Sequence, residues 1–260
     1  MTTYTIAIGN QKGGVAKTTT VISLGGALAE MGQSVLLIDL DAQANLTLST
    51  GNDPLKMRGT IADVLLESAN LYSVSRATSI AGLDLIPANS EMEMAERFLP
   101  IRQNYESILR LAMDGNEAYD YVLLDCPPSL GAVTQNALNA AQMLIIPTQA
   151  EYFSAHALRS MLGATRRIRQ QGNPALVTRI LITMFDQRNR IHREISEQLR
   201  STFNDYLLET VIQLDTKLRE SAVVGLPITH YLSRTRGTLQ YRALAQELVQ
   251  YVQETTQQPD

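Results

Sequence analysis

Apolar positions divide the chain into two alternating kinds of segment. Short runs rich in Val, Ile and Leu predict strands, and they fall at residues 5–8, 34–39, 83–87, 121–125, 143–148 and 179–185. Apolar residues recur at helical spacing between most of them, which predicts helices over 18–32, 91–112, 155–171, 190–203 and 237–254. Strands that alternate with helices form βαβ units, so we expect an α/β fold with a doubly wound, mainly parallel sheet flanked by helices.

The pattern shows no boundary between domains. The chain has 260 residues, of which 45% are hydrophobic, and this is ample for the core of one large or two small domains. No repeat, low-complexity segment or linker rich in Pro and Gly divides it. We therefore predict a single domain over residues 1–254 and a disordered tail over 255–260, which reads TTQQPD. Gly32 is predicted to end the first helix.

The composition excludes several classes of protein. No apolar run reaches the roughly 18 residues needed to span a bilayer, and the N-terminus lacks the basic start and cleavage site of a signal peptide. The single cysteine, Cys126, cannot form a disulfide within the chain. One thiol also excludes a metal or iron–sulfur site made from several thiolates of one chain. These features predict a cytoplasmic protein.

Charge is distributed unevenly, although the formal net charge is only −4. The segment from Arg159 to Arg242 contains 14 Lys and Arg against 7 Asp and Glu, whereas the remainder contains 8 basic and 19 acidic residues. Such asymmetry is typical of a basic face that binds a polyanion. It is equally compatible with a few arginine-rich helices that are simply solvated, so both interpretations stay open at this point.

Polar residues follow three of the predicted strands at the point where each ends. The sequence GNQKGGVAKTTT (9–20) follows the first strand, Asp39 and Asp41 follow the second, and Asp125 ends the fourth. In doubly wound sheets, ligands bind at the carboxyl ends of the strands. We therefore expect these side chains to meet at one edge of the sheet.

The loop after the first strand has the composition of a phosphate cradle. The usual pattern is Gly, four residues, then Gly-Lys-Ser/Thr, but Gln11 and Ala16 occupy the two glycine positions and an additional lysine, Lys12, stands in front. Backbone amides of residues 13–18 are expected to bind the β-phosphate, helped by the dipole of the following helix. Ala16 fits only if its backbone avoids positive φ. The predicted nucleotide-binding residues of this loop are Gly13, Gly14, Val15, Ala16, Lys17, Thr18 and Thr19.

Each polar side chain has a predicted role in phosphoryl transfer, which needs positioning and charge neutralisation above all. Lys17 would contact the β- and γ-phosphates, Thr18 would ligate Mg²⁺, and Thr19 would bind the α-phosphate. Asp125 ends the run YVLLD, and four apolar residues before an aspartate are typical of the Walker B motif, whose carboxylate orients Mg²⁺ or its water. Asp41 is placed to hold the attacking water. Asp39 either supports the water shell of the metal or caps a turn.

Three of these segments resemble the deviant Walker A, A′ and B motifs of the ParA/Soj/MinD ATPases: KGGVAKTTT, IDLDAQAN and YDYVLLDCPPSLG. The similarity continues in PTQAEYFSAHAL (147–158), TMFDQR (183–188) and ESAVVGLPITHY (220–231), so it covers nearly the whole chain. The chain is most similar to the short ParA/Soj branch. One difference is Ile212–Gln213, which stands where the family often has Ile-Pro at the adenine site.

The resemblance implies an ATP- and Mg²⁺-dependent hydrolase that works as a homodimer. It implies that Lys12 crosses the dimer to contact the ATP of the partner subunit, so that Lys12, Lys17 and Asp41 form the catalytic set. It also implies non-specific DNA binding in the ATP state, a nucleoid-associated location and a ParB-like or other cargo adaptor protein as partner. Two positions match DNA-binding residues of the Soj branch, and basic neighbours are plausible additions; these are Arg188 and Lys217, with Arg190, Arg193 and Arg219.

Other functions are weighed against this one. The final helix lacks the basic face of a membrane-binding helix, so a MinD-like membrane association is not expected. Two alternatives remain open: a small-molecule ligase of the same superfamily, such as dethiobiotin synthetase, and a switch that binds nucleotide without hydrolysing it. The cargo also stays open, because plasmids, chromosomes, carboxysomes and chemotaxis clusters are all positioned by similar ATPases.

Overall fold

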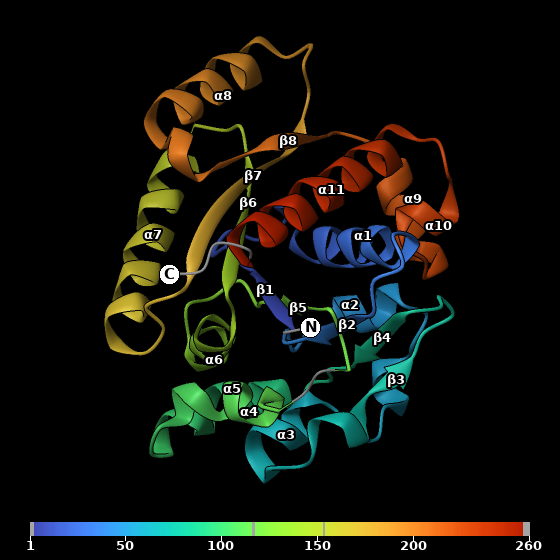
Figure 1. Ribbon diagram of the computed structural model, residues 1–260, viewed down its shortest axis with the longest axis vertical. Helices are drawn as coiled ribbons and strands as arrows, with labels where there is room; N and C mark the ends of the chain where they lie inside the picture. The colour runs from blue at the N-terminus through green and yellow to red at the C-terminus, as the bar shows by residue number, and fades with distance from the viewer. Residues whose placement is uncertain (1–2, 116–117, 153, 257–260) are drawn as a thin grey trace.

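A single sheet with helices on both faces forms the body of the molecule (Figure 1). The computed structural model describes residues 3–115, 118–152 and 154–256. Within these residues the strands are β1 (Tyr4–Ile8), β2 (Val35–Asp39), β3 (Arg76–Ala77), β4 (Leu83–Ile86), β5 (Tyr121–Asp125), β6 (Met143–Gln149), β7 (Val177–Phe185) and β8 (Leu207–Gln213). The helices are α1 (Lys17–Glu30), α2 (Asn45–Ser49), α3 (Ile61–Glu67), α4 (Met92–Phe98), α5 (Ile108–Met113), α6 (Ala132–Ala140), α7 (Ser154–Gln171), α8 (Arg190–Phe203), α9 (Lys217–Val224), α10 (Ile228–Tyr231) and α11 (Arg236–Thr256).

The strand order confirms the predicted fold class. The order is β3-β4-β2-β5-β1-β6-β7-β8, and every described pairing is parallel except that of β3 with β4. The chain extends the sheet in one direction from β1 to β2 and in the other from β6 to β8. The direction therefore reverses around β1, which lies between β5 and β6, and such a reversal is where doubly wound sheets open a binding crevice.

Successive side chains along each strand point to opposite faces of the sheet, so each face has its own hydrophobic core. In β1, Ile6 and Ile8 face the core shared with α1, α10 and α11, whereas Ala7 faces the core shared with α3 to α8. All three side chains are fully buried. Burial on both faces explains why the inner strands are continuous apolar runs rather than alternating ones.

The helix predicted over 91–112 is wrong. The chain instead forms α4, a 3₁₀ turn at Leu99–Ile101, a second 3₁₀ turn at Tyr105–Ser107, and α5. Pro100 explains the break, because proline donates no backbone hydrogen bond and its ring collides with the preceding helical turn. Asn104, with φ 56°, then turns the chain between the two 3₁₀ segments.

The remaining predicted elements are present with small shifts. Gly32 has φ 82° and lies just beyond the C-cap of α1, as predicted. Helix α11 continues to Thr256, so the first two residues of the predicted disordered tail are helical, and residues 257–260 lie outside the described residues. Strands β3 and β8 and the short helices α2, α3, α6, α9 and α10 have no counterpart in the sequence prediction.

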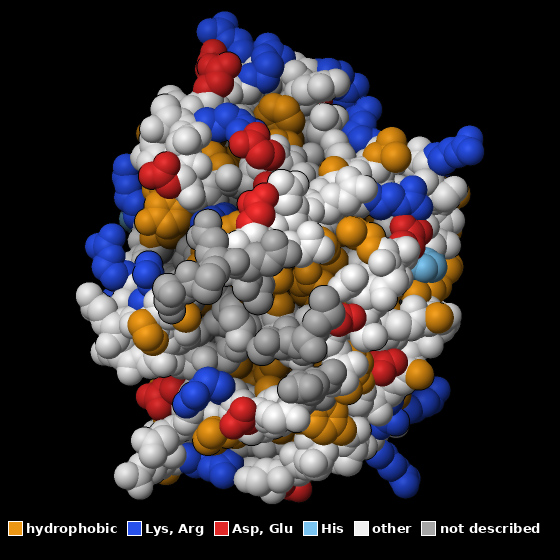
Figure 2. Space-filling view, viewed as in Figure 1, with side chains coloured by type: hydrophobic (Ala, Val, Ile, Leu, Met, Phe, Trp, Pro, Cys, Tyr) orange, Lys and Arg blue, Asp and Glu red, His pale blue; other side chains and the backbone are white. Residues whose placement is uncertain are grey.

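The surface shows where the uneven charge lies. Figure 2 shows Lys and Arg side chains gathered at the end of the molecule where α8 lies and along the side formed by α7. The exposed arginines of these two helices are Arg159, Arg166, Arg167, Arg169, Arg190 and Arg193. No helix in the described part of the chain is long and apolar enough to cross a bilayer.

Candidate functional site

The ends of three neighbouring strands bring the predicted polar residues together. Ile8 at the end of β1 is in register with Asp125 at the end of β5, and Asp125 is in register with Asp39 at the end of β2. The loop that follows β1 therefore begins beside both carboxylates. The expectation that these groups meet at one edge of the sheet is confirmed.

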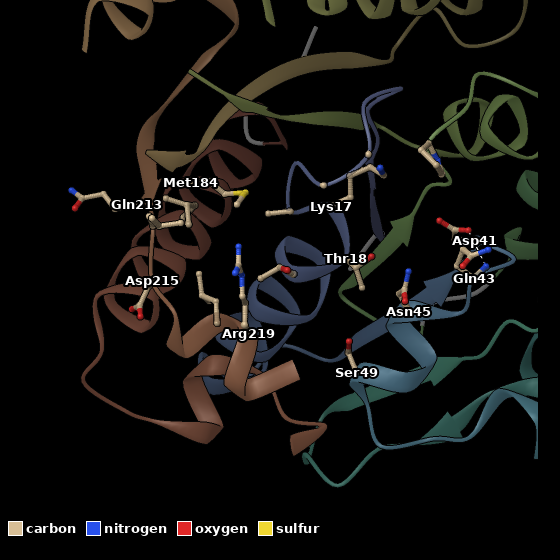
Figure 3. Close-up of a pocket in the computed structure, with 18 residues that line it drawn as sticks. Lys17, Thr18, Asp41, Gln43, Asn45, Ser49, Met184, Gln213, Asp215 and Arg219 are labelled. Atoms are coloured by element: carbon tan, nitrogen blue, oxygen red, sulfur yellow. Dashed lines mark hydrogen bonds between the residues drawn. The ribbon is translucent and has the colours of Figure 1, made fainter. Parts of the chain in front are cut away.

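A cavity of about 520 Å³ opens at this edge (Figure 3). Its walls come from the loop after β1, the segment after β2, the ends of β7 and β8, and α9. The lining residues are Gly13, Gly14, Ala16, Lys17, Thr18, Thr19, Asp41, Gln43, Asn45, Ser49, Pro128, Met184, Ile212, Gln213, Leu214, Asp215, Leu218 and Arg219. The loop residues predicted to bind phosphate thus lie on the cavity wall, except for Val15, whose side chain is buried.

The loop itself is held by contacts from β6 and β7. Thr183 Oγ1 donates a hydrogen bond to the carbonyl of Val15 at 3.0 Å, and Gln149 Nε2 donates one to the carbonyl of Gly14 at 3.1 Å. These two hydrogen bonds hold the loop against β6 and β7. Gln149 was not identified from the sequence; its signal was its place in the PTQAEYFSAHAL segment.

Ala16 contradicts the expectation about its backbone. Its φ is 70° and its ψ is 33°, which is the left-handed region. An alanine pays a steric penalty there that glycine does not. The loop geometry, fixed by its neighbours, overrides the local preference of this residue.

Lys17 and Thr18 start α1 and present their side chains to the cavity. Lys17 is only 8% exposed, and its Nζ donates a hydrogen bond to the carbonyl of Lys12 at 3.3 Å. Thr18 Oγ1 donates to Oδ2 of Asp125 at 2.7 Å. The hydroxyl oxygen of Thr18 keeps its lone pairs for a ligand, as a magnesium-ligating threonine requires.

Asp125 and Asp39 form a pair of buried carboxyl groups. Burial, followed by repulsion from Asp39, raises the pKa of Asp125 well above its usual value, and burial raises the pKa of Asp39 to about 6. Oδ1 of Asp125 has no hydrogen-bond partner among the described residues. These two carboxyl groups resist ionisation, and they lie beside the Thr18 hydroxyl. Oxygen ligands of this kind suit a hard divalent cation with its water shell, and the positive charge of the cation would favour the ionised form of both carboxyl groups.

Asp39 and Asp41 differ in what they do to the chain. Asp39 accepts hydrogen bonds from the backbone amide and the hydroxyl of Thr47, at 2.8 and 2.7 Å, and from the amide of Asp41 at 3.2 Å. It therefore organises the turn after β2, in agreement with the turn-capping alternative. Asp41 lines the cavity. Its Oδ1 accepts a hydrogen bond from the amide of Gln43 at 3.0 Å, and its Oδ2 has no partner among the described residues.

Lys12 lies outside the cavity. Its Nζ donates to Oε1 of Gln149 at 3.3 Å and forms an ion pair with Glu151. Its side chain is 37% exposed. The two lysines of the loop thus face different surroundings, since Lys17 faces the cavity of its own chain and Lys12 lies at the surface.

The predicted DNA-binding residues differ in their immediate surroundings. Arg188 forms an ion pair with Asp186 at 3.1 Å, and Lys217 forms one with Glu220 at 2.8 Å. Arg219 lines the cavity instead. The sequence could not distinguish a cavity-facing arginine from a surface one on α9, because this depends on how α9 packs.

Two features define the P-loop NTPase class. A lysine-bearing loop joins the first strand of a parallel sheet to the first helix, and an aspartate on the neighbouring strand binds the threonine that follows the lysine. The comparisons with known proteins agree. A family model described as an AAA domain matches residues 3–178. Two named members of the ParA/Soj family of partition ATPases are 37% and 38% identical to this chain over 94% of its length, and the chain belongs to that family.

The similarity to individual relatives extends over nearly the whole chain. The sporulation initiation inhibitor protein Soj of Bacillus subtilis is 38% identical over 245 residues, covering 94% of this chain and 97% of that protein. The chromosome partitioning protein ParA of Caulobacter vibrioides is 37% identical over 250 residues, covering 94% and 93%. The crystal structure of cobyrinic acid a,c-diamide synthase from Mycobacterium smegmatis, with a bound ATP analogue and magnesium, is 34% identical in sequence. It superimposes over 99% of this chain and 99% of that chain with a TM-score of 0.85.

Proposed function

We propose that this chain, a single ATPase domain over residues 1–254, hydrolyses ATP with Mg²⁺ and changes its assembly state as it does so. In the ATP state two chains form a nucleotide-sandwich homodimer that binds DNA non-specifically, and hydrolysis releases it. The dimer would be cytoplasmic and nucleoid-associated, and it would segregate a plasmid or chromosome, or position another cargo, through a ParB-like or other adaptor protein. The names of the Soj and ParA relatives support this proposal.

The chemistry rests on positioning. Backbone amides of the loop 13–18 bind the β-phosphate, and Lys17 neutralises the β- and γ-phosphate oxygens. Thr18 would hold Mg²⁺, with Asp39 and Asp125 supporting it through water, and the ion would supply charge neutralisation at the phosphates. Asp41, which lines the cavity and has one oxygen unbound within the described chain, holds the attacking water in line with the γ-phosphate.

The observation that carries the proposal is the different placement of the two lysines. Lys17 already serves the cavity of its own chain, whereas Lys12 is 37% exposed and its Nζ is held by two acceptors near the surface. A surface cation beside a phosphate site can reach the phosphates of a second chain. Dimerisation would then depend on the triphosphate, because each charge-assisted contact contributes about 1.5–3 kcal/mol.

The test is the variant Lys12→Ala. We expect it to retain ATP binding but to lose the dimer that Mg²⁺ and ATP induce in the wild-type chain, as measured by light scattering. Lys17→Ala is the control, because it removes a cation from the chain's own site and should lose ATP binding itself. A Lys12→Ala chain that dimerises normally with ATP would refute the role of this lysine, and a wild-type chain that stays monomeric with Mg²⁺ and ATP would refute the sandwich dimer.

The small-molecule ligase remains a second candidate, because the Mycobacterium smegmatis structure bears the name of a synthase that forms amides. A ligase activates a substrate carboxylate with the γ-phosphate, so its ATP turnover requires a small acid and not DNA. Phosphate release measured with DNA, with candidate carboxylic acids and with neither separates the two functions. Stimulation by an acid alone would favour the ligase, and no release under any condition would favour the non-hydrolysing switch.

A further inference from the structure

Arg219 enters the cavity from α9, across from the phosphate-binding loop. Figure 3 shows its side chain directed toward the middle of the cavity, with Met184 and Gln213 on one side and Lys17 and Thr18 on the other. Arg219 is exposed, and its side chain lies over the mouth of the cavity, between the cavity's two ends.

The start of α9 is fixed by the chain around it. Asp215 accepts hydrogen bonds from the amides of Lys217 and Gly237, both at 2.9 Å, so it joins the first turn of α9 to the first turn of α11. Gly237 leaves no spare room, because a Cβ there would lie 3.1 Å from the buried side chain of Leu218. Arg219 follows directly, and its backbone position is set by these contacts.

The end of α9 is also fixed. Gly225 has φ 77°, and a Cβ at this position would lie 2.9 Å from the backbone of Gly51, which follows α2. Since α9 is anchored at both ends, the direction of Arg219 into the cavity follows from the packing of the helix. It does not depend on a contact of the guanidinium group itself.

The guanidinium group of Arg219 has no partner within residues 3–115, 118–152 and 154–256. Lys217, two residues before it, is paired with Glu220, whereas the side chain of Arg219 forms no hydrogen bond or ion pair with any residue that the structure describes; its backbone amide donates to the carbonyl of Thr216 at 3.0 Å. Asp215 also lines the cavity, but its carboxylate accepts hydrogen bonds from two backbone amides and is not paired with Arg219. An unpaired arginine facing Lys17 across a cavity is a site for an anion.

The position along the cavity identifies the anion. The loop residues 13–18 and Asp41 form the end that holds the terminal phosphates, while Met184, Ile212 and Leu214 form an apolar end suited to a purine base. Between a base and its terminal phosphates lie the ribose and the α-phosphate, and only the α-phosphate is charged. Resting on the nucleotide-binding function proposed above, we infer that Arg219 binds the α-phosphate of the nucleotide, together with Thr19 on the opposite wall.

Nucleotide titrations of the full chain test this inference. Displacement of a fluorescent ADP analogue gives dissociation constants for ATP, ADP, AMP and adenosine with the wild type and with Arg219→Ala. We expect the constants for ATP, ADP and AMP to rise by a common factor of about tenfold or more, because all three carry the α-phosphate. Adenosine should displace the analogue equally from both chains. Arg219→Lys should recover part of the loss, since it keeps the charge without the planar fork.

Controls separate this inference from its rivals. Arg234→Ala removes an exposed arginine outside the cavity and should leave all four constants unchanged. Dissociation constants of Arg219→Ala within twofold of those of the wild type would overturn the inference. An equal loss of affinity for adenosine would also overturn it, because this indicates a contact with the base, and so would a loss of affinity for ATP alone. Loss of DNA affinity at saturating ATP with unchanged nucleotide affinity would also overturn it. If wild-type chain, unlike a known P-loop ATPase, bound no nucleotide, the proposed function itself would fail.

Discussion

Lys12 and Glu151 form an ion pair within one chain, between the phosphate-binding loop and the segment that follows β6. Gln149 accepts a second hydrogen bond from the same ammonium group at 3.3 Å. The lysine that we propose to act on the nucleotide of a partner chain is therefore held by its own chain in this structure. Dimer formation would have to exchange this ion pair for a contact with phosphate.

This exchange gives a first prediction. Glu151→Gln removes the competing charge, so the ATP-dependent dimer should form at lower protein concentration. Because both side chains are exposed by more than a third, the pair is weak, and we expect the dimer dissociation constant to fall only by roughly two- to fivefold. Analytical ultracentrifugation with Mg²⁺ and a non-hydrolysable ATP analogue measures it.

A matched control for Glu151→Gln is available on α8. Glu194 forms a similar exposed ion pair with Arg190, and Glu194→Gln removes the same charge away from the cavity. It should leave the dimer unchanged. If Glu151→Gln weakens the dimer or has no effect, the pair does not compete with dimerisation, and Glu151 instead has a neutral or supporting role in the assembly.

The left-handed backbone of Ala16 gives a second prediction. Glycine adopts φ 70° without the steric penalty of alanine, so Ala16→Gly should stabilise the chain by roughly 0.5–1 kcal/mol. Urea unfolding with an unchanged m-value measures the difference. The same substitution at Ala243, an exposed residue of α11, should have the opposite sign, because glycine weakens an ordinary helix. Destabilisation by both substitutions would show that Ala16 is not strained.

The two aspartates after β2 give a third prediction. Asp41→Ala should keep the fold and ATP binding but slow phosphate release, which leaves a long-lived ATP dimer. Asp39→Ala should instead lower the free energy of unfolding by roughly 2–4 kcal/mol, because it leaves the amide and hydroxyl of Thr47 and the amide of Asp41 without their acceptor. Phosphate release assays and urea unfolding of both variants separate the roles. Normal turnover in Asp41→Ala would count against the water-positioning role.

Local patterns predicted the fold class and the residues that meet at the carboxyl edge of the sheet. The lysine loop, Asp39, Asp41 and Asp125 were found because a buried apolar strand followed by a polar group is a short-range signal, and parallel strands bring such ends together. Strand β8, with the sequence LLETVIQ, was missed because polar residues interrupt its apolar positions and much of it is only partly buried. Short segments of this kind are decided by their tertiary contacts.

The parts of the site that sequence analysis could not predict depend on long-range packing. Ala16 is forced into positive φ by a loop held from β6 and β7, and Arg219 faces the cavity because α9 is anchored to α11 and to the residue after α2. The intrachain partner of Lys12 is 139 residues away along the sequence. No local pattern contains this information.

The proposed DNA-binding cations are neutralised within the chain in the same way as Lys12. Arg188 shares two hydrogen bonds of 3.1 Å with Asp186, and this pairing lowers the pKa of Asp186 to about 2. Lys217 shares two with Glu220, at 2.9 and 2.8 Å. Each cation is exposed enough to exchange its carboxylate for a DNA phosphate.

This arrangement gives the last prediction. Arg188→Ala combined with Lys217→Ala should weaken DNA binding by the ATP-bound chain and reduce the slope of log affinity against log salt by roughly one for each lost phosphate contact. Asp186→Asn combined with Glu220→Gln should strengthen binding, because it frees the same two cations. Arg110→Ala removes an exposed arginine of α5; it is the control and should change neither quantity. Fluorescence anisotropy with a random-sequence duplex over a range of salt concentrations measures all three variants. A double alanine variant with unchanged affinity and slope would place the DNA surface elsewhere, for instance on the arginine-rich faces of α7 and α8.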